Sequence, residues 1–191
     1  MDQFSLRLLG GFAVHHGDRP VDVPPACQRL IALVALKRRP VHRLWVCAKL
    51  WPHAQTHRAV ASLRSALWRL RPTGADALLT VDPQYLQLSP DVSVDWHRSG
   101  DLIERLLDGD IDAQLVSELL PLLRRGELLD KWAEGWVSQA RDHYHAARVS
   151  AIETLGHAHE KHVPHYGRSA IRPGHARQPM RSSGTTEPSS S

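Results

Sequence analysis

Cationic and hydrogen-bonding side chains gather in one stretch of the chain, residues 56–72, with the sequence THRAVASLRSALWRLRP. No Asp or Glu occurs between His53 and Gly74. A guanidinium can bind phosphate oxygens or the O6 and N7 atoms of guanine, and imidazole and hydroxyl groups can add contacts to nucleic acid. The stretch therefore has the chemistry of a surface that binds a polyanion.

A helix is expected to position these side chains, because apolar residues recur in this stretch at helical spacing. The apolar face consists of Ala59, Val60, Leu63, Ala66, Leu67 and Leu70. The opposite face carries His57, Arg58, Ala61, Arg64, Ser65, Trp68 and Arg69. Such a helix is typical of DNA recognition. The alternative is an ordinary amphipathic helix with a solvated outer face, although such faces usually mix charges of both signs.

For a recognition helix, each outer side chain has an expected role. Residues near the helix start usually meet bases, so we assign His57, Arg58 and Ala61 to base edges. The other assignments are Arg64 to a base or a phosphate, Ser65 to either, Arg69 and Arg71 to phosphate, and Gln84 and Tyr85 in a following hairpin to the DNA backbone. Trp68 could pack against a sugar or cover that hairpin, and we favour packing.

Charge is distributed unevenly along the 191 residues. Residues 1–90 hold 12 Lys and Arg against 5 Asp and Glu, residues 91–163 hold 8 against 14, and residues 164–191 hold 4 against 1. A basic first half, an acidic second part and a basic tail predict modules with different partners, the first a candidate for binding a polyanion.

Other classes of site are disfavoured by the sequence. Cys27 and Cys47 are too few and too far apart for a disulfide framework or zinc site, so buried thiols are expected. No apolar run suits a membrane span, no secretion signal is visible, and a cytoplasmic location with no membrane partner follows. No phosphate loop, nucleophile motif or paired carboxylates indicate an enzyme or a cofactor. The cluster His157, His159, His162 and His165 matches no metal-site geometry.

The order of expected elements is short strands over 4–9, 12–14 and 21–23, helices over 26–37, 42–50 and 56–71, and a hairpin over 77–81 and 85–88. This order predicts an α+β winged helix-turn-helix over 1–91. Helices are then expected over 96–107, 111–123 and 136–162, with Gly100 interrupting the first of them. Residues 164–191 are rich in Pro, Gly, Ser and Arg, which predicts a disordered tail.

Several segments together resemble the SARP class of bacterial transcriptional activators. They are LRLLGGFAV at 6–14, CQRLIALVAL at 27–36, LWP at 50–52, SLRSALWRLR at 62–71, VDWH at 94–97 and GELLDKWAEGWV at 126–137. That class joins an OmpR/PhoB-type winged helix to a TPR-like bacterial transcriptional activation domain, here expected over 92–163.

The resemblance implies a function and partners. Helix 56–71 would enter the major groove of double-stranded DNA, hairpin 77–88 would be the wing, and the loop between the second and third helices would face RNA polymerase. Family members bind direct repeats side by side, so a homodimer on DNA is one expected form. His53 stands where an Asp often follows LWP, and His42 where Ser or Thr often caps the second helix, so weaker capping is expected at both.

The expected activation domain is short, with three helices before the tail. A TPR-like array buries its apolar faces by stacking neighbours, so Ile152 and Leu155 are expected to be left uncovered. The region could pair with another chain, belong to a naturally short member, or reflect a shift of reading frame near residue 163.

Two other functions stay open: a protein-interaction module of acidic helices without specific DNA binding, and a truncated competitor that lacks activation.

Overall fold

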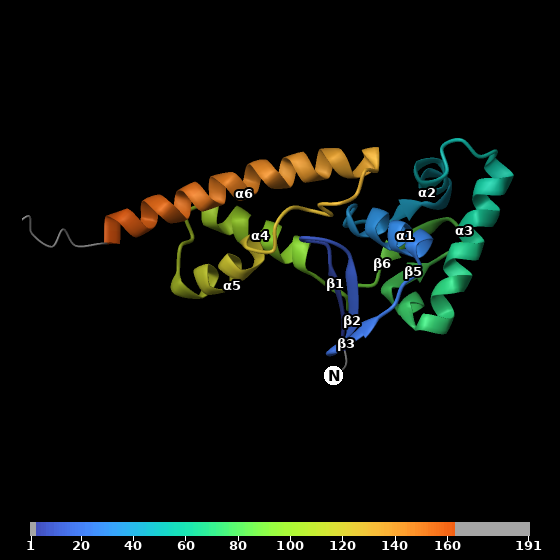
Figure 1. Cartoon of the computed structure of the whole chain (residues 1–191), viewed down its shortest axis with the longest axis horizontal. Coiled ribbons are helices and arrows are strands. Elements are labelled where there is room, and N and C mark those ends of the chain that lie inside the picture. Colours follow the sequence, from blue (N-terminus) through green and yellow to red (C-terminus); the bar gives the residue numbers. More distant parts are fainter. Residues whose placement is uncertain (1–2, 163–191) are drawn as a thin grey trace, which may run out of the picture.

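The structure, a computed structural model, describes residues 3–162, and side chains as far as residue 157. Over this range the chain forms six α-helices and two small sheets, an α+β fold. Figure 1 shows an elongated molecule with α3 at one end and α6 reaching toward the other. None of the described helices is both long enough and apolar enough to span a bilayer.

The first sheet has the strand order β3-β2-β1-β7 and consists of β1 (Phe4–Arg7), β2 (Ala13–His16), β3 (Arg19–Val21) and β7 (Ser93–Val94). Its first three strands are antiparallel, whereas β7 runs parallel to β1. The three expected N-terminal strands are present with shifted bounds. The expected strand over 4–9 ends at Arg7, because the Leu8 and Leu9 N–H groups donate to the Asp95 carboxylate instead of to a strand of the sheet.

Three helices follow: α1 (Pro25–Ala35), α2 (Arg43–Leu50) and α3 (Thr56–Leu70). Pro25 suits the first turn of α1, where a missing N–H costs nothing. Every residue from Leu30 to Ala35 is buried, which makes α1 the central helix of this half. Both predicted structural cysteines are indeed buried and free, and the Cys27 thiol donates a hydrogen bond to the Ala66 carbonyl over 3.3 Å, joining α1 to α3.

The second sheet, β4-β6-β5, places a hairpin beside these helices. Its strands are β4 (Val41–His42), β5 (Leu79–Val81) and β6 (Tyr85–Leu88). The expected hairpin strand over 77–81 was too long, because residues Ala75–Leu78 form a short 3-10 helix after another at Arg71–Thr73. Leu78 is completely buried, so packing helps to hold this turn, and its backbone carbonyl also accepts the N–H of Ser89 at 2.8 Å.

The second part of the chain is helical, with α4 (Asp95–Leu107), α5 (Ala113–Leu123) and α6 (Gly135–His162). Helix α4 passes through Gly100 without a break, so the expected interruption there was wrong. On α6 the buried residues Val137, Tyr144 and Ala151 repeat every seven positions, the spacing of a seam that packs on a neighbouring helix. The Tyr144 hydroxyl meets the buried Ser99 hydroxyl of α4 at 3.0 Å.

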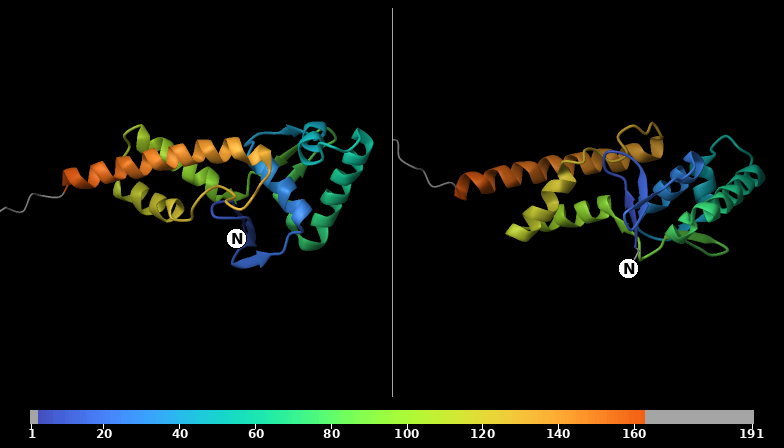
Figure 2. Two further views of the ribbon diagram at one scale, coloured as in Figure 1. Left: turned by 45° about the horizontal axis from the view of Figure 1, so that its top comes forward. Right: turned by 60° about the horizontal axis from the view of Figure 1, so that its bottom comes forward.

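The far end of α6 extends past α4 and α5 in all three views (Figures 1 and 2). Ile152 is 47% exposed there, as expected for an uncovered face, whereas Leu155 is partly buried against the core. The expectation was therefore right for Ile152 and too strong for Leu155. The predicted tail, residues 164–191, and the side chains of His159, His162 and His165 lie outside the described range.

Asp95 joins the first sheet to the helical part. Its carboxylate, 7% exposed, accepts hydrogen bonds from the Leu8 N–H at 2.8 Å and the Leu9 N–H at 3.3 Å, and pairs with Arg125 at 3.1 Å. Burial raises the pKa of Asp95, and these hydrogen bonds oppose the rise. The backbone N–H of Gly10 also donates to the backbone carbonyl of Glu127 at 2.8 Å. The two halves therefore share a hydrogen-bonded junction and one continuous core.

Candidate nucleic-acid interface

The outer face of α3 is fully available to a partner. All ten residues that the sequence assigned to DNA contacts are exposed: His57, Arg58, Ala61, Arg64, Ser65, Trp68, Arg69, Arg71, Gln84 and Tyr85. The buried residues of the helix are Ala59, Leu63, Ala66 and Leu70, all from the predicted apolar face. The helix therefore docks with one side and leaves the cationic side free, as its periodicity predicted.

The outer face of α3 has two flanks. Arg64 and Trp68 lie one turn apart and line a groove that faces the β5–β6 hairpin, together with Arg71 just beyond the helix. Arg69 lies on the side nearer α1, where its charge partly opposes the rise that burial causes in the pKa of the Cys27 thiol. Helical spacing places Arg58 on the same flank as Arg69. The cations thus cover a broad surface rather than one line.

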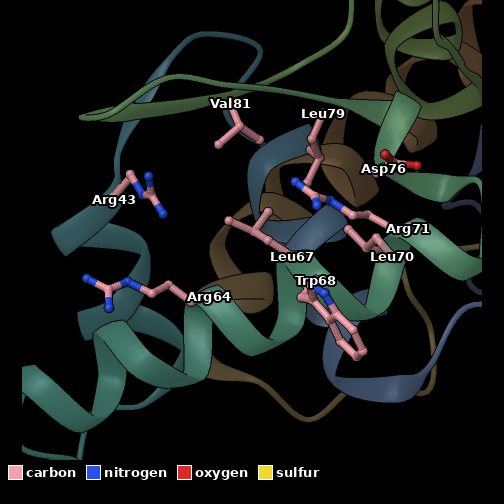
Figure 3. A pocket seen from close by; sticks show the side chains of 9 residues that line it. All are labelled: Arg43, Arg64, Leu67, Trp68, Leu70, Arg71, Asp76, Leu79 and Val81. Atoms are coloured by element: carbon pink, nitrogen blue, oxygen red, sulfur yellow. The ribbon is translucent and has the colours of Figure 1, made fainter.

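The groove between α3 and the hairpin, called the α3–hairpin groove below, has a volume of about 480 Å³. Its walls are formed by three arginines, one acid and several apolar residues: Arg43, Arg64, Leu67, Trp68, Leu70, Arg71, Asp76, Leu79 and Val81. Figure 3 shows Arg43 and Arg64 at one end and Arg71 with Asp76 at the other. With three guanidinium groups against one carboxylate, the groove favours an anionic occupant.

Trp68 does not cover the hairpin. The sequence left two forms of packing open for its indole, against a DNA sugar or over the hairpin, and 66% of the residue is exposed. It borders the α3–hairpin groove beside Leu67 and leaves most of its ring free (Figure 3). A large exposed indole at the edge of a cationic groove is available for contact with a partner.

Arg43 was missed by the sequence argument, although it borders the same groove. It is the first residue of α2, and its guanidinium Nη1 donates to the Asp82 carbonyl at 3.2 Å. Its backbone N–H donates to the Gln84 carbonyl at 2.8 Å. The available signal was its position, because a cation in the first turn of a helix opposes the helix dipole and needs another reason to be there.

The hairpin tip is ordered by Asp82. One carboxylate oxygen of Asp82 accepts the N–H of Tyr85 at 2.6 Å and that of Gln84 at 2.7 Å. These two hydrogen bonds lower the pKa of Asp82. The tip is therefore closed by its own side chain, which leaves the side chains of Gln84 and Tyr85 exposed.

His42 contradicts the expected weak cap of α2. Its Nδ1 accepts the backbone N–H of Leu44 at 3.2 Å, so the imidazole caps the N-terminus of α2 in place of the Ser or Thr hydroxyl that is usual at this position. Its ring also packs edge-on against the Tyr85 ring, with centroids 5.5 Å apart. His42 therefore links the start of α2 to the hairpin. His53, the other departure from the family pattern, is exposed.

The fold of this chain is similar to that of a protein whose structure has been solved. No protein-family model matches the sequence, and no curated protein does. Among solved structures, that of Mycobacterium tuberculosis EmbR in complex with a low affinity phosphopeptide is similar, with a TM-score of 0.54 and 23% sequence identity. The similarity covers 83% of this chain and 44% of the EmbR chain, so this protein spans less than half the length of its structural neighbour. It supports the mixed α+β fold predicted from the sequence.

Proposed function

We propose that this protein is a sequence-specific DNA-binding transcriptional regulator of the SARP type, in which residues 1–91 act as a winged helix-turn-helix. One observation carries the proposal: the outer face of α3 is exposed, contains no acid and continues into the arginine-lined α3–hairpin groove. Helix α3 would lie in the major groove of double-stranded DNA, with the β5–β6 hairpin as the wing. The similarity to EmbR in fold is consistent with this assignment.

The proposed roles change along α3, from its start to its end. His57, Arg58 and Ala61, near the helix start, would meet base edges, and Arg64 and Ser65 either bases or phosphates. Arg69 and Arg71 would bind phosphates, and Gln84 and Tyr85 the DNA backbone beside the wing. Arg43 joins this set, because its guanidinium borders the same groove as Arg64 and Arg71. The protein would act by binding, without catalysis and without a cofactor.

Residues 92–163 would form a partial TPR-like activation domain that recruits RNA polymerase. Three packed helices in this range and the uncovered Ile152 at the far end of α6 fit a shortened helical array. The exposed turn of residues 52–55 between α2 and α3 is the second proposed polymerase contact. The alternative function, a competitor that binds promoter DNA but does not activate transcription, has the same DNA-binding half. A reporter assay in cells distinguishes the two, because an activator raises reporter expression and a competitor does not.

Selection from a random duplex library followed by gel-shift with competitor tests the proposal, because the operator sequence is unknown. We expect enrichment of a short motif, arranged as a direct repeat, and binding that falls steeply as salt rises. If the selection enriches no motif, or if the protein does not bind DNA at moderate salt, the alternative of a protein-interaction module is favoured. A charge-reversed variant, Arg58→Glu with Arg64→Glu, serves as the control that should enrich nothing.

A further inference from the structure

A second cationic cavity lies far from α3 in the sequence, on the outer face of the first sheet. It has a volume of about 490 Å³ and is called the sheet pocket below. Its polar lining comes from β1, β2, β7, α4 and the turn after α5: Ser5, Arg7, His15, Ser93, Asp95, Arg98 and Arg125. The function proposed above uses none of these residues.

The floor of the sheet pocket is a row of polar side chains in register. Ser5 on β1 pairs with His15 on β2 and with Ser93 on β7, so three polar side chains lie side by side on the same face of neighbouring strands. Arg7 lies two residues further along β1, on the same face. The intervening residue, Leu6, is only 1% exposed because its face of the sheet belongs to the core. The polar face is thus set by strand alternation.

Three guanidinium groups surround this floor and retain most of their donors. A guanidinium has five N–H donors. Arg98 donates through Nη2 to Glu118, and Arg125 donates through Nη1 to Asp95 at 3.1 Å. Among residues 3–157, Arg7 forms no side-chain hydrogen bond or ion pair. The one carboxylate lining the pocket, that of Asp95, is already committed to the Leu8 and Leu9 N–H groups.

The sheet pocket is large enough for a small molecule rather than a single inorganic ion. A volume of about 490 Å³ falls within the range of small-molecule sites. Leu122, half-buried, adds an apolar wall. Planar guanidinium groups bind carboxylate and phosphate oxygens through paired N–H donors. We propose that the sheet pocket binds a small organic anion, bearing phosphate or carboxylate groups, through Arg7, Arg98 and Arg125.

The sheet pocket lies where the two halves of the chain meet, so a ligand bound there would affect the stability of both halves. The pocket joins strands of the first sheet to α4 and to the end of α5, beside the Asp95–Arg125 pair that joins the two halves. An anion bound there would hold the three arginines together and stabilise the folded chain in proportion to its occupancy. The sheet pocket is therefore a site through which a metabolite could control the junction. This role is independent of whether α3 binds DNA.

The test uses the full chain with inorganic phosphate, 3-phosphoglycerate and citrate as probes, at constant ionic strength. Calorimetry and amide NMR should show saturable binding of at least one organic anion, with shifts at Ser5, His15 and Ser93. Arg7→Gln and Arg98→Gln should each weaken that binding by about tenfold, the equivalent of one lost charged hydrogen bond. Arg19→Gln, an exposed cation at the start of β3 on the same sheet, is the matched control and should bind as the wild type does.

The ranking of the probes distinguishes the two anion chemistries. Stronger binding of 3-phosphoglycerate than of citrate supports a phosphate group, and the reverse order supports carboxylates. The proposal is overturned if no probe binds saturably into the millimolar range. It is also overturned if Arg7→Gln and Arg98→Gln bind no more weakly than Arg19→Gln, or if the shifts fall on α3 instead of the first sheet.

Discussion

The guanidinium of Arg43 lies 3.2 Å from the carbonyl oxygen of Asp82, and this hydrogen bond joins the first turn of α2 to the tip of the β5–β6 hairpin. The Arg43 backbone N–H forms a second bond to Gln84 in the same tip. A single residue therefore connects the hairpin to the helices and also places a cation at the α3–hairpin groove. In the proposed function, the position of the wing and one of the cations beside it depend on the same side chain.

Replacing Arg43 should weaken DNA binding more than it weakens the fold. For Arg43→Ala we expect a loss of about 1–2 kcal/mol in binding to a selected duplex, because a charged hydrogen-bonding group is removed. The backbone bond to Gln84 remains, so unfolding by urea should change by about 0.5 kcal/mol or less. Anisotropy titration and urea unfolding measure the two effects. Binding equal to that of the control Arg19→Ala would refute a role for Arg43.

Gly10 and Gly74 form a matched pair for testing the junction between the halves. Both have a φ of +73°, but a Cβ on Gly10 would lie 2.3 Å from the Arg125 carbonyl oxygen, whereas one on Gly74 would meet nothing within 4 Å. Gly74→Ala should cost about 1 kcal/mol, the strain of a left-handed alanine. Gly10→Ala should cost about 3 kcal/mol or more, because the junction backbone must also move. Similar urea midpoints for the two variants would contradict the packing described here.

His97 should make the folded chain sensitive to mild acid. Its Nε2 lies 2.9 Å from the Ala35 carbonyl oxygen, and burial lowers its pKa below the ordinary 6.5. Because the folded state binds this proton less readily than the unfolded chain, the stabilising contribution is present above pH 6.5 and is lost as pH falls through the lowered pKa. Urea unfolding from pH about 7.5 to about 5 measures it. His97→Gln should flatten this part of the profile, and an unchanged slope would exclude His97 as its source.

Local patterns in the sequence predicted the helices well. Helix α3 was predicted to within a residue or two, since its apolar spacing, its acid-free outer face and the following Pro72 are all local signals. The burial of Cys27 and Cys47 followed in the same way from their apolar surroundings. The exposure of the cations and small polar residues on the outer face of α3 was also predictable, because a helix that buries one face must expose the other.

Contacts between distant residues could not be predicted in this way. The parallel pairing of Ser5 with Ser93 involves a two-residue strand, β7, too short to show alternation. The part played by Arg43 depends on where the hairpin folds back, and the cap formed by His42 depends on the orientation of one imidazole. The sheet pocket likewise combines strands and helices from both halves of the chain. Each of these features is a matter of tertiary packing, which periodicity does not encode.

The most direct test of the central claim is the salt dependence of DNA binding by Arg58→Ala and Arg71→Ala, measured on a selected duplex and on a random one. If α3 binds DNA as proposed, Arg58→Ala should lose about 1–3 kcal/mol on the selected duplex only. Arg71→Ala should weaken both duplexes alike and reduce the slope of log K against log salt by about 1. If both variants bind both duplexes as the wild type does at every salt concentration, the outer face of α3 is not the DNA-binding surface.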